Sequence, residues 1–355
     1  MLKLNSSDTK IIKFLTFIPP VFGIIVFTFI VKLLDNDLVA IRLPYYQGLM
    51  SFYSLFYMGF TYVTNRHSIL GKKMLLILIL IYLFPTIIYS HTGIDVMVVI
   101  LLSLIFFLSS CILYLLLLKE KLIFYITFTA LNSIILPFTL ILNLFYLILL
   151  TFLLFILLIY TYVKVKKYLS YFIYKTNGLD IIKSIFIHSP FLIFPFFDYK
   201  IQEIIGVLSY ENYILSYKYI NGLITILFSY AQLSLLFNGE FKRGTLILRI
   251  LMIIFFLIVA LVSFNYKLIF LILLGLYSLA VNLSSLLLRN KLINGINFSQ
   301  SLLGLIFLSL YIISLTSFRN YISLNLNLFV LLMFISMVLP CLLLVINFDR
   351  NENKV

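Results

Sequence analysis

Long uninterrupted apolar runs are the feature that most constrains this chain. Met74–Leu83 and Phe145–Ile159 contain no charged residue. Each lies within an apolar run of about twenty residues, the length that an α-helix needs to cross a bilayer. Of the 355 residues, 63% are hydrophobic and 11% are charged, whereas soluble domains carry roughly a quarter charged residues. The sequence therefore predicts an all-α polytopic membrane protein.

Polar clusters divide the apolar sequence into candidate transmembrane helices. We expect about twelve of them on this pattern. They cover residues 11–33, 43–64, 72–90, 94–118, 121–142, 144–164, 180–203, 211–237, 245–264, 267–288, 297–317 and 325–347.

The distribution of lysine and arginine gives an independent test of this division. The positive-inside rule requires basic residues to collect in every second connection, on the cytoplasmic side. Most of the 26 basic residues do so. The exceptions, which fall in the other connections or inside spans, are Lys32, Arg42, Lys200, Lys218, Lys267 and Arg319. We therefore expect a multi-pass membrane protein with both termini in the cytoplasm.

The connections between the predicted spans are short, so no folded extramembrane domain is expected. Met1–Lys10 has the character of a short tail, and we expect the first span to remain in the mature protein. The net charge of +14 is attributed to topology signals and contact with anionic lipid headgroups, without a nucleic-acid partner. Cys111 and Cys341 fall inside spans, where we expect small buried thiols and no disulfide.

Two pairs of similar segments suggest an internal repeat. IIKFLTFIPP at residues 11–20 matches IIKSIFIHSP at 181–190, and YYQGLMS at 45–51 matches YINGLIT at 219–225. Such matches also arise by chance in a chain rich in Ile and Leu. A true duplication predicts two six-helix lobes with the same orientation, a parallel repeat with the substrate path between the lobes.

The predicted lobes have defined limits. Residues 1–164 form the N-terminal lobe, 165–179 a cytoplasmic linker, 180–348 the C-terminal lobe and 349–355 a cytoplasmic tail. Pro20 and Pro190 occupy matching places in the first helix of each lobe. A proline inside a helix removes a backbone hydrogen bond, so both are candidate hinges, although prolines are also common in membrane helices.

Ionisable residues at membrane depth are costly and usually face an interior cavity. Lys218 lies inside a predicted span, as a cavity cation or a side chain that snorkels to the surface. Lys32 closes the first span, where a solvated rim is the simpler interpretation. Asp198 is a rim residue or an ion-coupling carboxylate, and Asp95 opens a helix, where an N-terminal position alone explains an Asp.

Catalytic and cofactor motifs are absent from the sequence. The three histidines lie far apart with no metal-ligand spacing, and no phosphate-binding loop is present, so we expect neither a metal nor a cofactor. Asn132, Gln232 and Asn282 are uncharged polar residues within spans, for which hydrogen bonding between helices is the default expectation.

Two segments resemble a known transporter family. They are FTFIVKLLDNDLVAIRLPYYQGLMSFYSLFYMGFTYVTNR, at residues 27–66, and FLIFPFFDYKIQEIIGVLSYENYILSYKYINGLITILF, at residues 191–228. These segments, together with the expected twelve spans in two halves, make the chain look like the Wzx-type O-antigen flippases. That family belongs to the multidrug, oligosaccharidyl-lipid and polysaccharide exporter superfamily. Gly59 and Arg66 match the second helix of that family, and Asp198 with the tyrosines of residues 213–219 matches its seventh and eighth helices.

The resemblance implies export of an undecaprenyl-pyrophosphate-linked oligosaccharide by alternating access, driven by a proton or sodium gradient. A pyrophosphate needs cations along its route. The candidate substrate contacts are Lys218, Lys32, Arg42 and Arg319, and the candidate ion-coupling residues are Asp198 and Asp95. Partners implied are the lipid-linked oligosaccharide, membrane lipids, a polymerase and a chain-length regulator.

Three alternatives remain open. An O-antigen polymerase, which is an enzyme, is disfavoured because no outer connection is long enough for its periplasmic loop. A different six-plus-six secondary exporter is disfavoured because the connection NRHSILGKK lacks the Asp of the major-facilitator signature. A scaffold or accessory subunit is the third alternative.

Overall fold

The fold is described here from a computed structural model of the chain. It describes residues 18–33, 37–64, 72–92, 94–118, 122–169 and 198–238, together with the isolated positions 15, 272, 275, 276, 306, 309, 313, 317 and 320. Every regular element within these residues is a helix, which confirms the all-helical prediction for this part of the chain.

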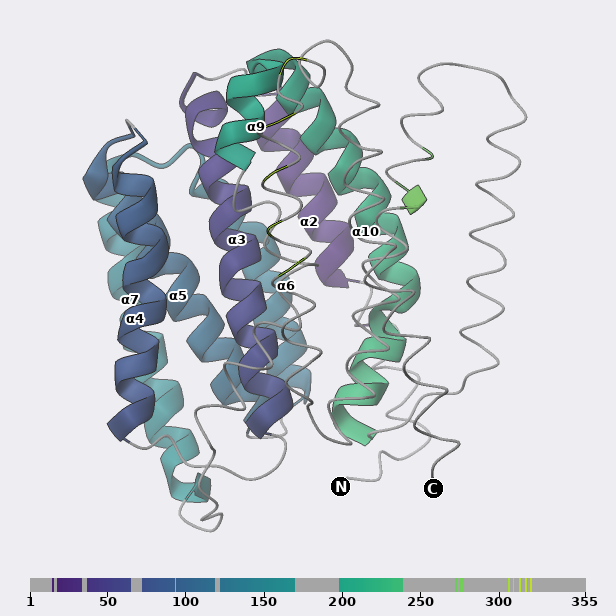
Figure 1. Ribbon diagram of the computed structural model, residues 1–355. Coiled ribbons are helices and arrows are strands. Elements are labelled where there is room, and N and C mark those ends of the chain that lie inside the picture. The colour runs from purple at the N-terminus through teal and green to yellow at the C-terminus, as the bar shows by residue number, and fades with distance from the viewer. Residues whose placement is uncertain are drawn as a thin grey trace. The chain divides into compact units, whose positions relative to one another are not determined.

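The described helices follow one another with short gaps (Figure 1). They are α2 (Ile18–Thr28), the π-helical turn η1 (Phe29–Leu33), α3 (Asp37–Thr64), α4 (Lys72–Ser90), α5 (Val96–Leu118), α6 (Leu122–Phe138), α7 (Leu144–Leu169), α9 (Asp198–Ile205) and α10 (Val207–Asn238).

The chain divides into two compact units. The first, here called the N-terminal unit, comprises Val21–Ile185 with Leu192–Tyr199; the second comprises Met1–Pro20, Phe186–Phe191 and Lys200–Val355. Most of the described residues belong to the N-terminal unit. The lobe limits expected from the repeat, at 1–164 and 180–348, stay a prediction.

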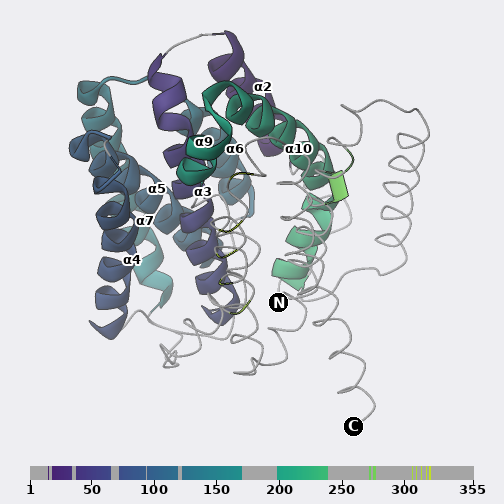
Figure 2. The same cartoon turned by 45° about the horizontal axis from the view of Figure 1, so that its top comes forward.

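Helix α5 is the centre of the N-terminal unit. It packs against α3, α4, α6 and α7, and Figures 1 and 2 both show it among these neighbours. Its sequence VMVVILLSLIFFLSSCILYLLLL is apolar all round. A helix with no polar face has no side suited to water, so it buries itself among others or in lipid. Val99, Leu102 and Ile105 are accordingly buried in the core.

Helices α2, α3, α5 and α6 of this unit contact one another in a ring. A Cβ at Gly23 of α2 would lie 3.6 Å from Ser133 Cβ of α6. The Phe27 ring of α2 lies 5.9 Å from the Tyr46 ring of α3, and Tyr46 in turn lies 5.4 Å from Phe106 of α5. Because α5 also contacts α6, the helices α2, α3, α5 and α6 form a closed group, here called the four-helix group.

Several predicted helix limits were wrong by a turn or more. Helix α3 begins at Asp37, not at 43, because an Asp in the first turn favours a helix through its charge. Helix α6 ends at Phe138, not at 142, since the next residues form tighter turns, with Thr139 N donating to Leu136 O and Leu140 N to Pro137 O. Helix α7 continues to Leu169 because its lysines are good helix formers.

The expected connection at residues 204–210 is also wrong. Helix α9 runs to Ile205 and α10 starts at Val207, so only Gly206 separates them. Gly206 has φ of +84°, a left-handed conformation that glycine adopts without the penalty of a side chain. Its N–H donates to Gln202 O and its carbonyl accepts from Tyr210 N, so one residue ends one helix and starts the next.

Two of the described helices contain stretches long and apolar enough to cross a membrane, Val96–Leu116 of α5 and Leu144–Lys164 of α7. Three further helical stretches, Ile18–Lys32, Ile79–Ser90 and Ile123–Phe138, are apolar but shorter. Both findings agree with a membrane protein. The full count of twelve spans stays a prediction.

Candidate functional site

Arg42 is a buried cation near one end of the N-terminal unit. It lies in the second turn of α3 and is only 6% exposed. Its Nη1 donates to the carbonyl of Thr139, at 3.2 Å, and to that of Leu142. These carbonyls lie just beyond the end of α6, where backbone acceptors lack partners within the helix and the helix dipole is negative. Arg42 therefore fastens α3 to the connection between α6 and α7.

Helices α5 and α7 each begin with a side chain that caps the first turn. Asp95 Oδ1 accepts from Met97 N at 2.9 Å, at the start of α5. Asn143 Oδ1 accepts from Tyr146 N at 3.1 Å, at the start of α7. Asp95 also lies within Coulombic range of the Arg42 guanidinium. Two residues that the sequence proposed for different roles, Arg42 and Asp95, are thus brought together.

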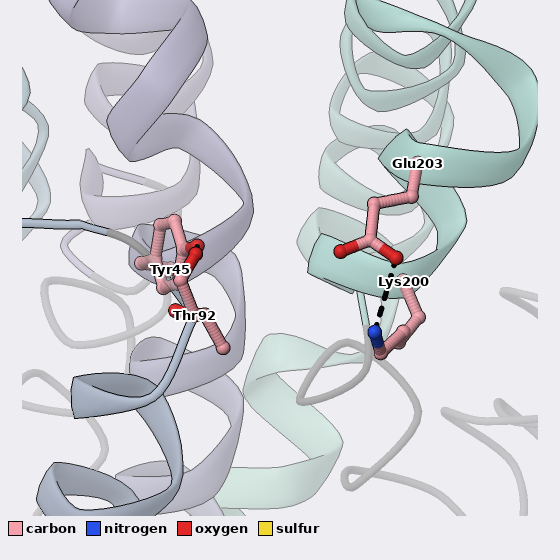
Figure 3. Close-up of polar contacts among 4 residues, drawn as sticks. All are labelled: Tyr45, Thr92, Lys200 and Glu203. Atoms are coloured by element: carbon pink, nitrogen blue, oxygen red, sulfur yellow. Dashed lines mark hydrogen bonds and ion pairs between the residues drawn. The ribbon is translucent and has the colours of Figure 1, made fainter.

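Three tyrosines pack on one another next to Arg42. The Tyr45 ring lies 5.2 Å from Tyr89 and 6.3 Å from Tyr199, and the Tyr89 ring lies 5.8 Å from Tyr199. The Tyr45 hydroxyl donates to Thr92 O at 3.4 Å, and Figure 3 shows the two residues side by side. We call Tyr45, Tyr89 and Tyr199 the tyrosine cluster. It joins α3, the end of α4 and the first residues of α9.

Asp198 lies near this cluster. It is 2% exposed and lies within Coulombic range of Tyr89. A buried carboxylate is costly unless neighbouring groups stabilise its charge. The two interpretations from the sequence, a rim residue and an ion-coupling carboxylate, both stay predictions.

The four-helix group contains buried polar atoms without a hydrogen-bond partner among the described residues. They include Thr28 Oγ1 on α2, Gln47 Nε2 on α3, Ser109 Oγ on α5, and both amide atoms of Asn132 on α6. Each helix of the group contributes at least one such residue. The hydrogen bond between helices expected for Asn132 is therefore absent, and the expectation was wrong.

Helical spacing places two of these residues at similar depths. Gln47 is five residues beyond Arg42 on α3, about 7.5 Å along the helix axis, and Asn132 is seven residues before Thr139 on α6, about 10 Å. An unpartnered buried polar atom costs about 1–3 kcal/mol. Native proteins retain such atoms chiefly where water, an ion or a ligand completes the bonding.

The other predicted site residues lie elsewhere or outside the described residues. Lys32 is exposed in η1, and Lys218 is partly buried on α10. Pro20 lies in α2, at the limit between the two units. Arg319 and Pro190 lie outside the described residues. The proposed roles of these five residues stay predictions.

Sequence reasoning missed the tyrosine cluster. In the sequence, Tyr45 is distinguished only as part of a repeat match, and Tyr89 carries no signal at all. Tyrosines are common in this chain, with 25 among 355 residues, so none stands out by type. Three further prolines, Pro44, Pro85 and Pro137, lie within α3, α4 and α6.

The described residues contain no group of three or more His, Cys, Asp or Glu side chains that could hold a metal ion. Comparison with protein-family models, curated proteins and solved structures gave no match. A function is therefore inferred from the sequence pattern and from the buried polar groups described above.

Proposed function

We propose that this chain is a secondary transporter that flips undecaprenyl-pyrophosphate-linked oligosaccharide repeat units across a bacterial inner membrane. It acts by alternating access, with twelve spans in two six-helix lobes and both termini in the cytoplasm. The proposal starts from the apolar runs, from basic residues in alternate connections and from the resemblance at residues 27–66 and 191–228.

The observation that supports a transport role most directly is the set of buried polar atoms in the four-helix group. Thr28, Gln47, Ser109 and Asn132 place them on four helices whose other buried residues are mostly apolar. A purely structural membrane bundle gains nothing from unpaired polar atoms, because each costs free energy. Atoms of this kind suit a route along which polar groups or water move.

Asp198 supplies a candidate for coupling to an ion gradient. It is buried beside Tyr89, at the start of the helix that leads through Gly206 into α10. Protonation or cation binding at a buried carboxylate changes its charge, and a charge change at such a position biases a conformational equilibrium. The proposed driving ion is H⁺ or Na⁺.

Arg42 has a different place in this proposal. Its Nη1 is engaged with two carbonyls, which favours a role in holding the fold over a mobile contact to pyrophosphate. Lys218, which is partly buried on α10, stays a candidate for a substrate contact.

Complementation tests the proposal. A flippase-deletion strain would carry the wild-type chain or the variants Asn132→Leu, Asp198→Asn and Lys218→Ala, with Lys200→Gln as the control. Lys200 is exposed and pairs with Glu203 at 3.0 Å (Figure 3). We expect the wild type and the control to restore the O-antigen ladder and the three variants to reduce it. Normal ladders from all three variants at normal protein levels would contradict the proposal.

A further inference from the structure

Helix α7 buries only a narrow stripe of its surface. Leu147, Thr151, Leu154 and Thr161 are buried, at the helical spacing of one face, on a helix that packs against α5. Only 17% of its apolar stretch is buried, compared with 56% for α5. The large apolar side chains that α7 exposes are Leu144, Phe145, Tyr146, Ile148, Leu149, Phe152, Leu153, Phe155, Ile156, Leu157, Ile159, Tyr160, Tyr162 and Val163.

The exposed surface has aromatic residues at both ends. Phe145 and Tyr146 lie in the first turn, and Tyr160 and Tyr162 lie in the last part of the apolar stretch. Fifteen residues separate Phe145 from Tyr160, about 22 Å along the axis. That length is most of a bilayer's hydrocarbon thickness, and tyrosine is enriched at both membrane interfaces.

The two ends differ in charge. The N-terminal end of α7 carries no charge, because its cap is the neutral residue Asn143 and its first turn has no charged residue. The other end carries Lys164, Lys166 and Lys167, and α7 has no acidic residue to balance them. Lys164 Nζ lies 5.6 Å from the centre of the Tyr160 ring, so the cation is held beside an exposed phenol. Lys167 follows Lys164 by three positions in the sequence of α7.

We propose that Tyr160, Lys164 and Lys167 bind the phosphate headgroup of an anionic phospholipid whose acyl chains lie along the exposed face of α7. The lysines supply two positive charges at one turn's spacing, and the tyrosine hydroxyl supplies a hydrogen-bond donor. This inference rests on the membrane location in the proposed function. It is independent of what the protein transports.

Thermal unfolding of the purified full-length chain in a neutral detergent tests the site. Phosphatidylglycerol is added to one sample and phosphatidylcholine with the same acyl chains to another. We expect phosphatidylglycerol to raise the Tm of the wild type more than phosphatidylcholine does. In Lys164→Gln/Lys167→Gln we expect this difference to shrink, because the apparent affinity for phosphatidylglycerol falls roughly fivefold for each lysine removed.

Two control variants separate headgroup binding from effects on the helix. Lys200→Gln removes one exposed positive charge elsewhere and should keep the full phosphatidylglycerol effect. Lys164→Arg/Lys167→Arg keeps both charges and should keep it too. If the glutamine variant responds to phosphatidylglycerol as the wild type does, or if Lys200→Gln loses the response, the proposal is wrong.

Further measurements distinguish the lipid from other occupants. Inorganic phosphate should leave the Tm unchanged; a shift as large as that of phosphatidylglycerol would mean that free anions suffice and would overturn the lipid assignment. Disulfide cross-linking between copies of Phe152→Cys in phosphatidylglycerol bilayers should fail, because lipid covers this face. Efficient cross-linking would show that a second copy of the chain, and not lipid, covers this face, and would overturn the proposal. A chain that binds lipid yet fails in complementation would contradict only the transport proposal.

Discussion

Helices α5 and α7 are nearly equal in sequence character and opposite in environment. Their apolar stretches have mean hydropathies of 2.9 and 2.7, yet 56% of the first and 17% of the second is buried. Helix α5 contacts four other helices, whereas α7 packs mainly on α5. Hydropathy therefore reports that a helix avoids water and does not report whether protein or lipid surrounds it.

The reason is the absence of a polar face on either helix. An amphipathic helix shows which side is buried by where its charges lie. In α5 and α7 nearly every position is apolar, so composition marks no buried side. What distinguishes them is the fit of particular side chains. Leu147 and Leu154 lie on one stripe of α7, while α5 buries residues such as Val99, Leu102 and Ile105.

Truncation of a core residue in α5 should have the largest effect on stability. Ile105 is fully buried, so Ile105→Ala leaves a cavity that packed neighbours cannot fill. We expect a loss of about 2–4 kcal/mol in the free energy of unfolding, measured by chemical denaturation in detergent. A loss below about 1 kcal/mol would mean that α5 is not the packed centre.

Loss of the guanidinium of Arg42 should come next. Arg42→Gln removes the donor for the Thr139 and Leu142 carbonyls, which hold the start of α7 near α3. Leaving such acceptors unpaired costs about 1–3 kcal/mol. Denaturation measures the cost, and Lys200→Gln at an exposed pair serves as the control, with an expected change of less than about 0.5 kcal/mol. Equal effects in the two variants would show that the buried contacts contribute nothing.

The two helix caps offer a matched pair between α5 and α7. Asp95→Ala and Asn143→Ala each remove one side-chain oxygen that accepts from a first-turn N–H. Capping is a local effect, so we expect similar losses of about 1 kcal/mol from both despite the different surroundings of the helices. The melting temperatures of the two variants would test this. A cost at Asp95 far above that at Asn143 would indicate that its charge beside Arg42 matters as well as the cap.

Truncation on the exposed side of α7 should have the smallest effect. Ile156 is 48% exposed, so Ile156→Ala removes few protein contacts. We expect the free energy of unfolding to change by no more than about 0.5 kcal/mol, measured in the same way as for Ile105→Ala in α5. A cost similar to that of Ile105→Ala would mean that another protein surface covers α7.

The sequence predicted the helices of the N-terminal unit well and its site poorly. Helix α4 has the predicted limits, 72–90, and α5 and α7 begin within two residues of the predicted starts, because apolar runs and polar breaks are local properties of the chain. Asp95 was expected at a helix start and is a cap. The Arg42 contacts to Thr139 and Leu142 could not be predicted, because nearly one hundred residues separate the partners.

By itself, the sequence determined that the chain is built of apolar helices and where most of them begin and end. These properties follow from side-chain hydrophobicity and local hydrogen bonding, which act over a few residues. Only the tertiary structure decided that α5 is central, that α7 is exposed, and that Arg42, Asp95 and Asp198 lie near a cluster of three tyrosines. Those outcomes depend on which apolar surfaces fit together, and hydrophobicity, being non-directional, leaves that choice to packing.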